Sequence, residues 1–349
     1  MLSAMKRLIG VVALIWLGVA AVHTAEAPVR DCEEITFNAE TAQAAEKKCP
    51  RISQHALRAL GSNVAFFHGL VSAQSPVPVW TAKLNDVRNA AALIPGARPL
   101  RINVLKFAES HRTKNFSVKG AAADPSVQAR TVFQVVYADG YVMVDAGMDQ
   151  QVHKFFGRGV EEPYDSEAAR QVERALKGAR LVVVTHEHGD HVAGVIRTPL
   201  ANELAPKTIL TRTQVQTLIT NPQMPEIRIT EEMARRYIVV DYDKYLPLAP
   251  GVAVIKAPGH TPGSQMVYVA LESGKEYLLI GDTAWHMDGV RSVRGKDAAW
   301  VAEDENALMD QLKWLNGLST EHNLFIVASH DDEEHRDLIQ KGLLGRQLE

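Results

Sequence analysis

Three histidines and two carboxylates crowd into six consecutive residues of this 349-residue chain. The run reads His186-Glu187-His188-Gly189-Asp190-His191. It follows an apolar stretch, residues 181–184, that has the character of a buried strand. On an extended or turning segment, His186 and His188 can face the same way and bind one ion, while Asp190 and His191 face a different direction. Imidazole nitrogens and carboxylate oxygens suit zinc or a similar first-row ion. The run therefore predicts two incomplete metal half-sites that need ligands from elsewhere.

Further polar residues stand at the ends of other predicted strands. They are Asp145, His260, Asp282 and His330. Open sheets place their ligand sites where strand ends meet at one edge, so we expect these residues to join the histidine run there. A lone histidine is more often a surface or hydrogen-bonded residue. We therefore assign the other histidines to that ordinary class: His23, His55, His68, His111, His153, His286, His322 and His335.

The region after residue 100 alternates β-branched or aromatic runs with helix-like segments. Strands are predicted at residues 101–107, 131–137, 141–144, 181–184, 208–210, 237–240, 252–255, 266–271, 277–280 and 324–328. Helices are predicted at residues 166–177, 213–219, 303–318 and 333–343. Ala138-Asp139-Gly140 indicates a hairpin. Many strands with helices between them indicate a layered α/β or α+β domain.

The N-terminus resembles an export signal. Lys6 and Arg7 precede an apolar run, residues 8–22, and a small-x-small site ends at Ala27. This pattern is typical of a cleaved signal peptide over residues 1–27, because the apolar run is shorter than the roughly 20 residues of a spanning helix. An uncleaved anchor is the alternative. We expect a secreted protein, in the periplasm of a bacterium, with no stable membrane insertion after cleavage.

Residues 28–99 are predicted to be an N-terminal extension of unknown role, ahead of a catalytic domain at residues 100–349. Export would expose Cys32 and Cys49 to oxidising conditions, so a disulfide between them is one hypothesis and two unrelated thiols the other. The net charge of −3 gives no reason to expect nucleic acid as a partner. The oligomeric state stays open.

Taken in order, the motifs resemble those of the metallo-β-lactamase superfamily over residues 101–344. They are His186-x-His188-x-Asp190-His191, Gly259-His260-Thr261-Pro262-Gly263-Ser264, Gly281-Asp282-Thr283, Ser329-His330-Asp331 and, earlier in the chain, Asp145 in Val142-Met143-Val144-Asp145-Ala146-Gly147. The resemblance implies an α/β fold of the αββα sandwich type with two metals at one edge. By position, the first metal would be held by His186, His188 and His260, the second by Asp190, His191 and His330, and Asp282 would bridge them.

This resemblance also implies an activity. Two divalent ions, with Zn²⁺ expected, would share a bridging hydroxide that attacks a small lactone, ester or related substrate outside the cytoplasm. Asp190 would be the catalytic residue that orients this hydroxide and handles its proton. The alternatives are a β-lactamase-type hydrolase of β-lactams and a non-hydrolytic metal-binding relative of the same fold.

The residues around Asp282 narrow the substrate only in part. A bridging aspartate argues against β-lactams, and Ser329-His330-Asp331-Asp332-Glu333 resembles the lactonase branch more than the glyoxalase II branch. The lactonases carry a tyrosine three residues after the bridge, where this chain has Trp285, whose only donor is its indole nitrogen. This departure puts acyl-homoserine lactones in doubt. Trp285 and His286 either line the substrate pocket or pack beside the site.

Overall fold

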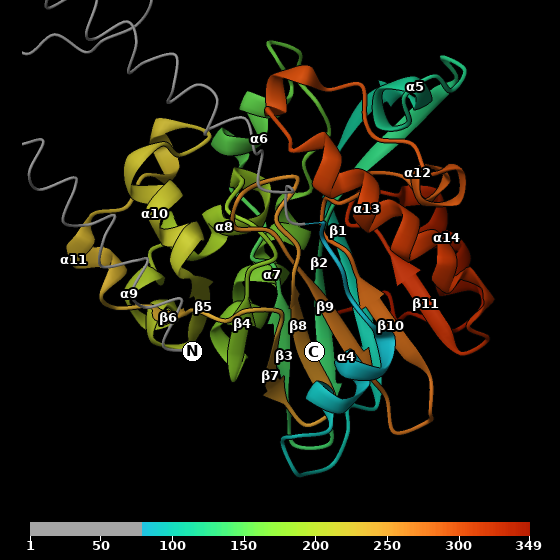
Figure 1. The fold of residues 1–349 in the computed structure, drawn as a ribbon. Helices are drawn as coiled ribbons and strands as arrows, with labels where there is room; N and C mark the ends of the chain where they lie inside the picture. The colour runs from blue at the N-terminus through green and yellow to red at the C-terminus, as the bar shows by residue number, and fades with distance from the viewer. Residues whose placement is uncertain (1–78) are drawn as a thin grey trace, which may run out of the picture. The chain divides into compact units, whose positions relative to one another are not determined.

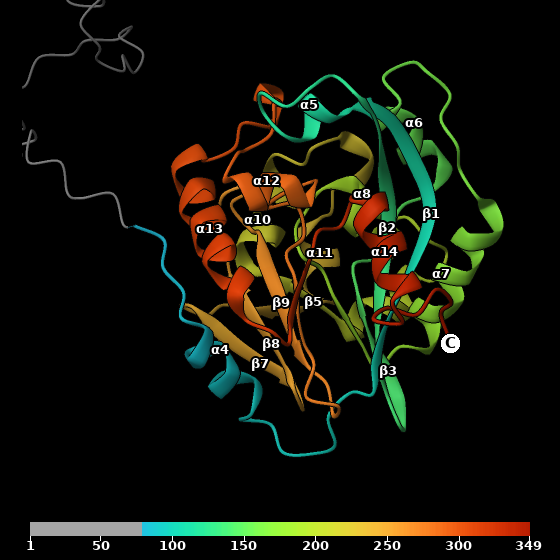
Figure 2. The same ribbon diagram turned by 90° about the vertical axis from the view of Figure 1, so that its right-hand side faces the viewer.

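The computed structural model describes residues 79–349. The predicted signal peptide, the pair Cys32 and Cys49, and the extension up to residue 78 lie outside the described residues. Within the described part, two sheets lie face to face and helices cover the outer face of each (Figure 1). Figure 2 shows these layers from the side, with α4 (Leu84–Ala91) and α13 (Glu305–Gly317) on one flank and α6 (Gln150–Phe156) and α7 (Ser166–Gly178) on the other. The predicted αββα sandwich is confirmed.

The first sheet of the described region has six strands in chain order. They are β1 (Arg101–Thr113), β2 (Pro125–Tyr137), β3 (Gly140–Val144), β4 (Leu181–Val183), β5 (Thr208–Thr211) and β6 (Ile238–Val240). The first three strands pair antiparallel, and β3 to β6 pair parallel. The predicted hairpin is present, since Tyr137 pairs with Gly140 across a two-residue turn. Gly140 has a φ of 149°, which favours glycine.

The second sheet of the described region has five strands, in the order β11-β10-β9-β8-β7. Their bounds are β7 (Tyr245–Ala249), β8 (Val252–Lys256), β9 (Gln265–Ala270), β10 (Glu276–Leu279) and β11 (Leu324–Val327). All neighbours are antiparallel except β10 and β11. The sequence patterns did not indicate β7, which carries Pro247 and lies at the sheet edge, where the missing N–H of a proline is tolerated.

The remaining helices of the described region are mostly short. The α-helices are α5 (Lys114–Ser117), α8 (Gly189–Ile196), α9 (Ala201–Leu204), α10 (Arg212–Thr220), α11 (Glu231–Ala234), α12 (Met287–Ser292) and α14 (Asp332–Gln340). The 3₁₀ turns are η1 (Ala205–Lys207), η2 (Pro225–Ile227), η3 (Ala299–Val301) and η4 (Leu318–Thr320). Asp165 caps α7 by accepting from the backbone of Glu167 and Ala168. None of the helices in residues 79–349 has the length and apolarity that a bilayer crossing requires.

Three apolar clusters hold the layers together. The cluster between the sheets is built from aliphatic residues such as Ile102, Val144 and Val267. A second cluster joins the six-stranded sheet to α7 and α8, and a third joins the five-stranded sheet to α4, α12 and α13. Leu84, Val87 and Ala91 of α4 belong to this third cluster. The described end of the predicted extension is therefore packed onto the sandwich.

Candidate metal centre

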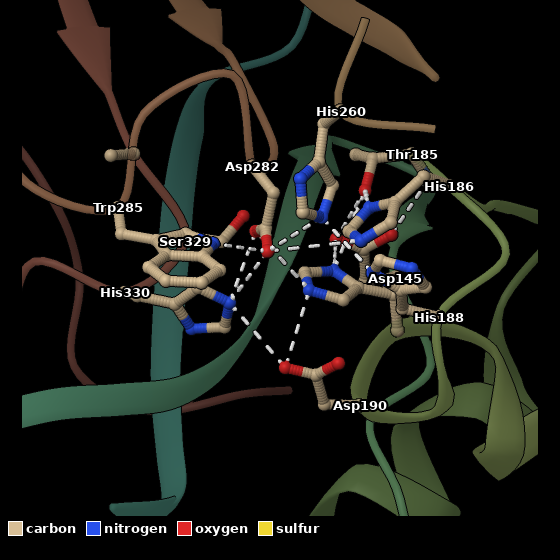
Figure 3. A network of polar contacts seen from close by, with 12 residues as sticks. Asp145, Thr185, His186, His188, Asp190, His260, Asp282, Trp285, Ser329 and His330 are labelled. Atoms are coloured by element: carbon tan, nitrogen blue, oxygen red, sulfur yellow. Dashed lines mark hydrogen bonds and ion pairs between the residues drawn. The ribbon is translucent and has the colours of Figure 1, made fainter. Parts of the chain in front are cut away.

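The residues predicted to bind metal lie close to one another in the structure (Figure 3). Three groups have ligand atoms within 4.8 Å of one another: His186, His188 and His260; His186, His191 and Asp282; Asp190, His191 and His330. His188 is partly buried and the other six residues are buried. The three groups share members, so they form one continuous cluster with room for more than one cation. The assignment of individual residues to metals remains a prediction.

Asp282 lies at the centre of this cluster. Its Oδ2 is 3.3 Å from Nε2 of His260 and its Oδ1 is 3.3 Å from Nε2 of His191. Nε2 of His330 lies near both oxygens, at 3.0 Å from Oδ1 and 3.2 Å from Oδ2. One carboxylate therefore faces histidines of both outer groups with different oxygens. This is the geometry that a bridging ligand requires.

Both sheets contribute ligand residues to the cluster. The six-residue histidine run follows β4 of the first sheet and ends in the first turn of α8. His260 follows β8, Asp282 follows β10 and His330 follows β11, all in the second sheet. The predicted meeting of these polar residues is confirmed, but they come from the strand ends of two sheets that face each other and not from one edge of a single sheet. Helix α8 begins inside the histidine run, so Asp190 and His191 point differently from His186 and His188, as their spacing indicated.

A glycine brings α8 close enough to complete this arrangement. A Cβ at Gly194 would overlap the backbone carbonyl of Ala146, so only glycine lets the helix approach the loop after β3. The contact is fastened by two backbone hydrogen bonds, from Ala146 N to His191 O at 2.8 Å and from Gly194 N to Gly147 O at 2.9 Å. His191 is thereby placed beside Asp145.

Asp145 supports the cluster from behind. It is fully buried and has a φ of 65°, a left-handed conformation that costs free energy in a residue other than glycine. Its carboxylate accepts from Thr185 N at 2.7 Å and from His191 Nδ1 at 2.8 Å. The strained backbone thus turns the carboxylate onto the next strand and the ligand histidine. This matches the supporting role that the resemblance implied.

Three histidines share one orientation. His191 donates through Nδ1 to Asp145, His260 donates through Nδ1 to Glu303 Oε1 at 2.5 Å, and His330 donates through Nδ1 to the Ala129 carbonyl at 2.6 Å. In each ring, Nε2 then faces Asp282 and the centre of the cluster. Metal-binding histidines hold their second nitrogen in this way, which fixes the tautomer and the ring direction.

The donor set fits a metal. Among residues 79–349, Nε2 of His186, Nε2 of His191 and Oδ1 of Asp282 are buried and lack a hydrogen-bond partner. Buried polar atoms without partners cost about 1–3 kcal/mol each, so a protein rarely gathers three of them at one point. A cation coordinated by these atoms would satisfy all three.

Charges in the cluster are strongly coupled. Burial, with help from His260, lowers the pKa of His188 to about 3, and burial together with His191 puts the pKa of His186 well below its usual value. Burial alone would raise the pKa of Asp282, but His330 and His191 outweigh it and the pKa lies well below its ordinary value. Burial would lower the pKa of His191, but Asp190 and Asp145 outweigh it and hold this pKa well above its usual value. Neutral imidazoles and ionised carboxylates are the forms that bind metal, so His191 would lose a proton on binding, whereas His186, His188 and Asp282 already have the required form.

Arg130 is a member of the site that the sequence patterns missed. Its Nη1 donates to Asp190 Oδ2 at 2.6 Å, and both side chains are almost entirely buried. Burial would raise the pKa of Asp190, but His191 and Arg130 outweigh it and hold the pKa well below its usual value. The predicted strand began only at residue 131, whereas β2 begins at Pro125 and includes Arg130. A charged residue in this otherwise apolar strand was the signal that could have indicated a functional role.

Trp285 lies directly beside Asp282. Its indole Nε1 donates to Asp282 Oδ2 at 2.7 Å, and its ring stacks on Phe116 with centroids 5.3 Å apart. Phe116 in turn lies 5.3 Å from the exposed ring of Trp300, and Arg158 covers Trp300 at 4.8 Å. We call Trp285, Phe116 and Trp300 the aromatic column. It runs from the candidate metal centre to the protein surface.

Two buried groups near the column carried no sequence signal. Lys296 lies between α12 and η3, and Glu303 lies just before α13. Neither belongs to a motif, and Glu303 fell inside the predicted helix 303–318, whose observed start is Glu305. Glu303 contacts both Lys296 and His260. Only the folded chain brings these side chains to the cluster.

Comparisons with known proteins agree with this geometry. Residues 127–300 match the model of the metallo-β-lactamase superfamily. A relative from Bacillus thuringiensis subsp. kurstaki, the N-acyl homoserine lactonase AiiA, is 22% identical over 263 residues, which cover 74% of this chain and 93% of the relative.

Solved structures give the same result for the fold. A quorum-quenching N-acyl homoserine lactone lactonase superposes with a TM-score of 0.54 at 15% identity, over 70% of this chain and 97% of that one. An N-acyl homoserine lactone hydrolase with N-hexanoyl-L-homoserine at its catalytic metal centre gives 0.53 at 16% identity, over 69% and 96%. Family, relatives and ligand set together support a metal-dependent hydrolase. The chain contains a metallo-β-lactamase superfamily domain.

Proposed function

We propose that this protein is a two-metal hydrolase of a small lactone, ester or related substrate, and that it acts outside the cytoplasm. The observation that carries the proposal is the position of Asp282, which faces the histidines of both outer ligand groups with different oxygens. In this proposal His186, His188 and His260 hold one cation, and Asp190, His191 and His330 hold the second. The expected ion is Zn²⁺, because imidazole nitrogen and carboxylate oxygen donors suit it.

When bound, a pair of cations lowers the pKa of a shared water towards neutrality and neutralises charge that develops on the substrate. The protein supplies the remaining parts. Asp190 would accept the proton of the attacking water, and Arg130, whose Nη1 donates to Asp190 Oδ2 at 2.6 Å, fixes where that carboxylate points. No serine or cysteine nucleophile is needed in this scheme.

The aromatic column favours a substrate that carries an apolar group. Phe116 and Trp300 extend the ring surface outward from Trp285. The guanidinium of Arg112 lies over the Phe116 ring at 5.8 Å and that of Arg158 over the Trp300 ring at 4.8 Å. A substrate with an acyl or planar group would bury apolar area against these rings, at about 25 cal/mol per Å². The relatives named above act on N-acyl homoserine lactones, so these are the first substrates to test.

The test is a substrate screen of the zinc-loaded mature protein. The panel comprises lactones with short and long acyl groups, carboxylic esters, thioesters, phosphoesters and β-lactams. We expect hydrolysis of lactones or esters, and its loss in Asp282→Asn. Turnover of β-lactams alone would replace the proposal with the β-lactamase alternative, and binding of metal without turnover of any class would favour the non-hydrolytic alternative.

Export is tested separately. We expect a reporter that is active only outside the cytoplasm to be active when fused after residue 99, and the secreted product to begin near residue 28. A product that retains residue 1 would contradict cleavage. Thiol titration of the same material tests the pair Cys32 and Cys49, since a disulfide leaves no reactive thiol.

A further inference from the structure

We propose that Trp285, Lys296 and Glu303 form a buried frame that fixes the orientation of Asp282 and His260 and thereby sets the metal affinity of the centre. We call these three residues the outer frame. The inference rests on the metal-binding part of the proposed function and deepens it. It concerns residues that contact candidate ligands, whereas the substrate is not involved.

The first arm of the outer frame is the contact between Trp285 and Asp282. The indole N–H donates to Oδ2 of Asp282 at 2.7 Å, and the ring is held in place by its stack on Phe116. This same oxygen faces His260 at 3.3 Å. A fixed donor on Oδ2 limits rotation of the carboxylate, so both oxygens stay directed at the two histidine groups.

Its second arm is the contact between Glu303 and His260. Oε1 of Glu303 accepts from Nδ1 of His260 at 2.5 Å, which leaves Nε2 to face Asp282 and His188. The loop that carries His260 is also tied to the segment that carries Glu303, because Asp304 N donates to Gly259 O at 2.9 Å. Ring direction and loop position are therefore set by the same segment.

Lys296 joins the two arms. Its ammonium lies 2.7 Å from Oε1 of Glu303, donates to the backbone carbonyl of Asp282 at 2.5 Å and lies 5.2 Å from the centroid of the Trp285 ring. Its side chain is 1% exposed, which is rare for a lysine. One buried cation thus contacts the carboxylate of one arm, the ring of the other arm, and the backbone of the bridging residue.

Stability does not account for this arrangement. A buried ion pair loses so much hydration that apolar residues of similar volume are often equally stable or better. By contrast, groups that hold a metal ligand through its second atom typically affect metal affinity by about 10–100-fold. A buried lysine that contacts both arms has the properties expected of a positioning group.

The outer frame also assigns a role to Trp285. Its single donor is already used by Asp282, so it is not free to polarise a substrate carbonyl. Trp285 is in this respect a positioning residue, and the substrate must be oriented by other groups. With tryptophan in place of tyrosine at this position, the side chain contacts the bridging aspartate and has no free donor for the substrate.

The experiment compares Trp285→Phe, Lys296→Met and Glu303→Gln with the unaltered protein. Trp285→Phe removes the donor to Asp282, Lys296→Met removes the ammonium that contacts Glu303 and the Asp282 carbonyl, and Glu303→Gln removes the carboxylate charge. Each substitution keeps most of the side-chain volume. Zn²⁺ affinity is measured by competition with a chromophoric chelator, and the visible spectrum of the Co²⁺-loaded protein reports ligand geometry. We expect Zn²⁺ affinity to fall by about 10–100-fold in each variant, with shifted Co²⁺ bands. Lys296→Met and Glu303→Gln each leave one charge of the buried pair without its partner, so the thermal midpoint of the metal-free protein should also fall in these two variants and is measured alongside.

Lys256→Met is the matched control. Lys256 also donates to a backbone carbonyl, that of Tyr242 at 3.0 Å, and lies 6.0 Å from the Tyr242 ring, but neither partner is a candidate ligand. We expect its Zn²⁺ affinity and Co²⁺ spectrum to match the unaltered protein. Affinity and spectra that stay unchanged in all three variants would overturn the inference, as would an equal loss in Lys256→Met.

The double variant Trp285→Phe with Glu303→Gln tests the link through Lys296. Residues in one network show non-additive effects, so we expect the double variant to lose less affinity than the sum of the two single losses. Full additivity would show two independent contacts and overturn the frame. These metal readouts need no substrate. A protein that binds Zn²⁺ normally but hydrolyses nothing would contradict the proposed function and leave this inference standing.

Discussion

Val144 and Asp145 are neighbours in the chain, and each is fully buried, yet they belong to opposite kinds of interior. Val144 lies in the aliphatic cluster between the sheets. Asp145, one residue later, has strained backbone and three polar contacts at the candidate metal centre. A residue that stabilises the fold and a residue that supports the candidate metal centre are therefore joined by one peptide bond.

This contrast separates two ways of damaging the protein. Substitutions in the cluster between the sheets remove apolar contacts and lower the free energy of unfolding. Substitutions at the centre remove charges whose burial was costly, so their main effect falls on metal binding and turnover. The predictions below test whether stability and chemistry separate as cleanly as the two regions do.

Asp282→Asn is expected to have the largest effect. Loss of the central carboxylate removes one negative charge from between the two ligand groups, and charge stabilisation by a metal pair contributes several kcal/mol to a hydrolytic rate. This corresponds to a fall of about a thousandfold in kcat/KM. The thermal midpoint of the metal-free protein should not fall. Asp139→Asn, in the exposed hairpin turn, is the control and should leave both quantities unchanged.

Ile102→Ala should produce the opposite pattern. Ile102 is fully buried between the sheets and pairs with Val135, so its truncation should lower the free energy of unfolding by about 2–5 kcal/mol. Zn²⁺ content per folded chain should stay the same. Urea unfolding followed by elemental analysis checks both points, and a loss of metal without a loss of stability would contradict the separation.

Removal of metal should lower both the activity and the stability of the protein. A ligand that binds only the folded state, at about a hundred times its Kd, stabilises that state by about 3 kcal/mol. Chelation should therefore abolish turnover and lower the thermal midpoint, and both should return when Zn²⁺ is restored. If the midpoint were the same with and without metal, the cluster would not bind a metal in the folded protein.

Asp145→Asn is the mildest change. Asparagine tolerates the left-handed backbone, but its amide cannot match the charged carboxylate that holds His191. We expect Zn²⁺ affinity to fall by about 10–100-fold and stability to change little. Asp145→Ala adds backbone strain and should be less stable than Asp145→Asn in the same urea titration.

The fold and the metal centre differ in how far the sequence alone predicts them. Strands such as β3 and β10 were predicted because buried strands have a clear apolar pattern, and the candidate ligands that the structure brings together were predicted because they follow such strands. Arg130, Lys296 and Glu303 escaped, since each is a single charged residue whose role depends on where three-dimensional packing places it. Strand β7 escaped because Pro247 contradicts the usual strand pattern.

The division of the ligands between the sheets has a consequence for the order of folding. Residues 186–191 are near one another in any state of the chain, whereas His260, Asp282 and His330 reach them only when the second sheet has docked on the first. Closing such long loops is entropically costly and slow compared with local contacts. We therefore expect the complete set of candidate ligands to assemble only at the end of folding. The rate of metal uptake during refolding would then report the rate at which the two sheets dock.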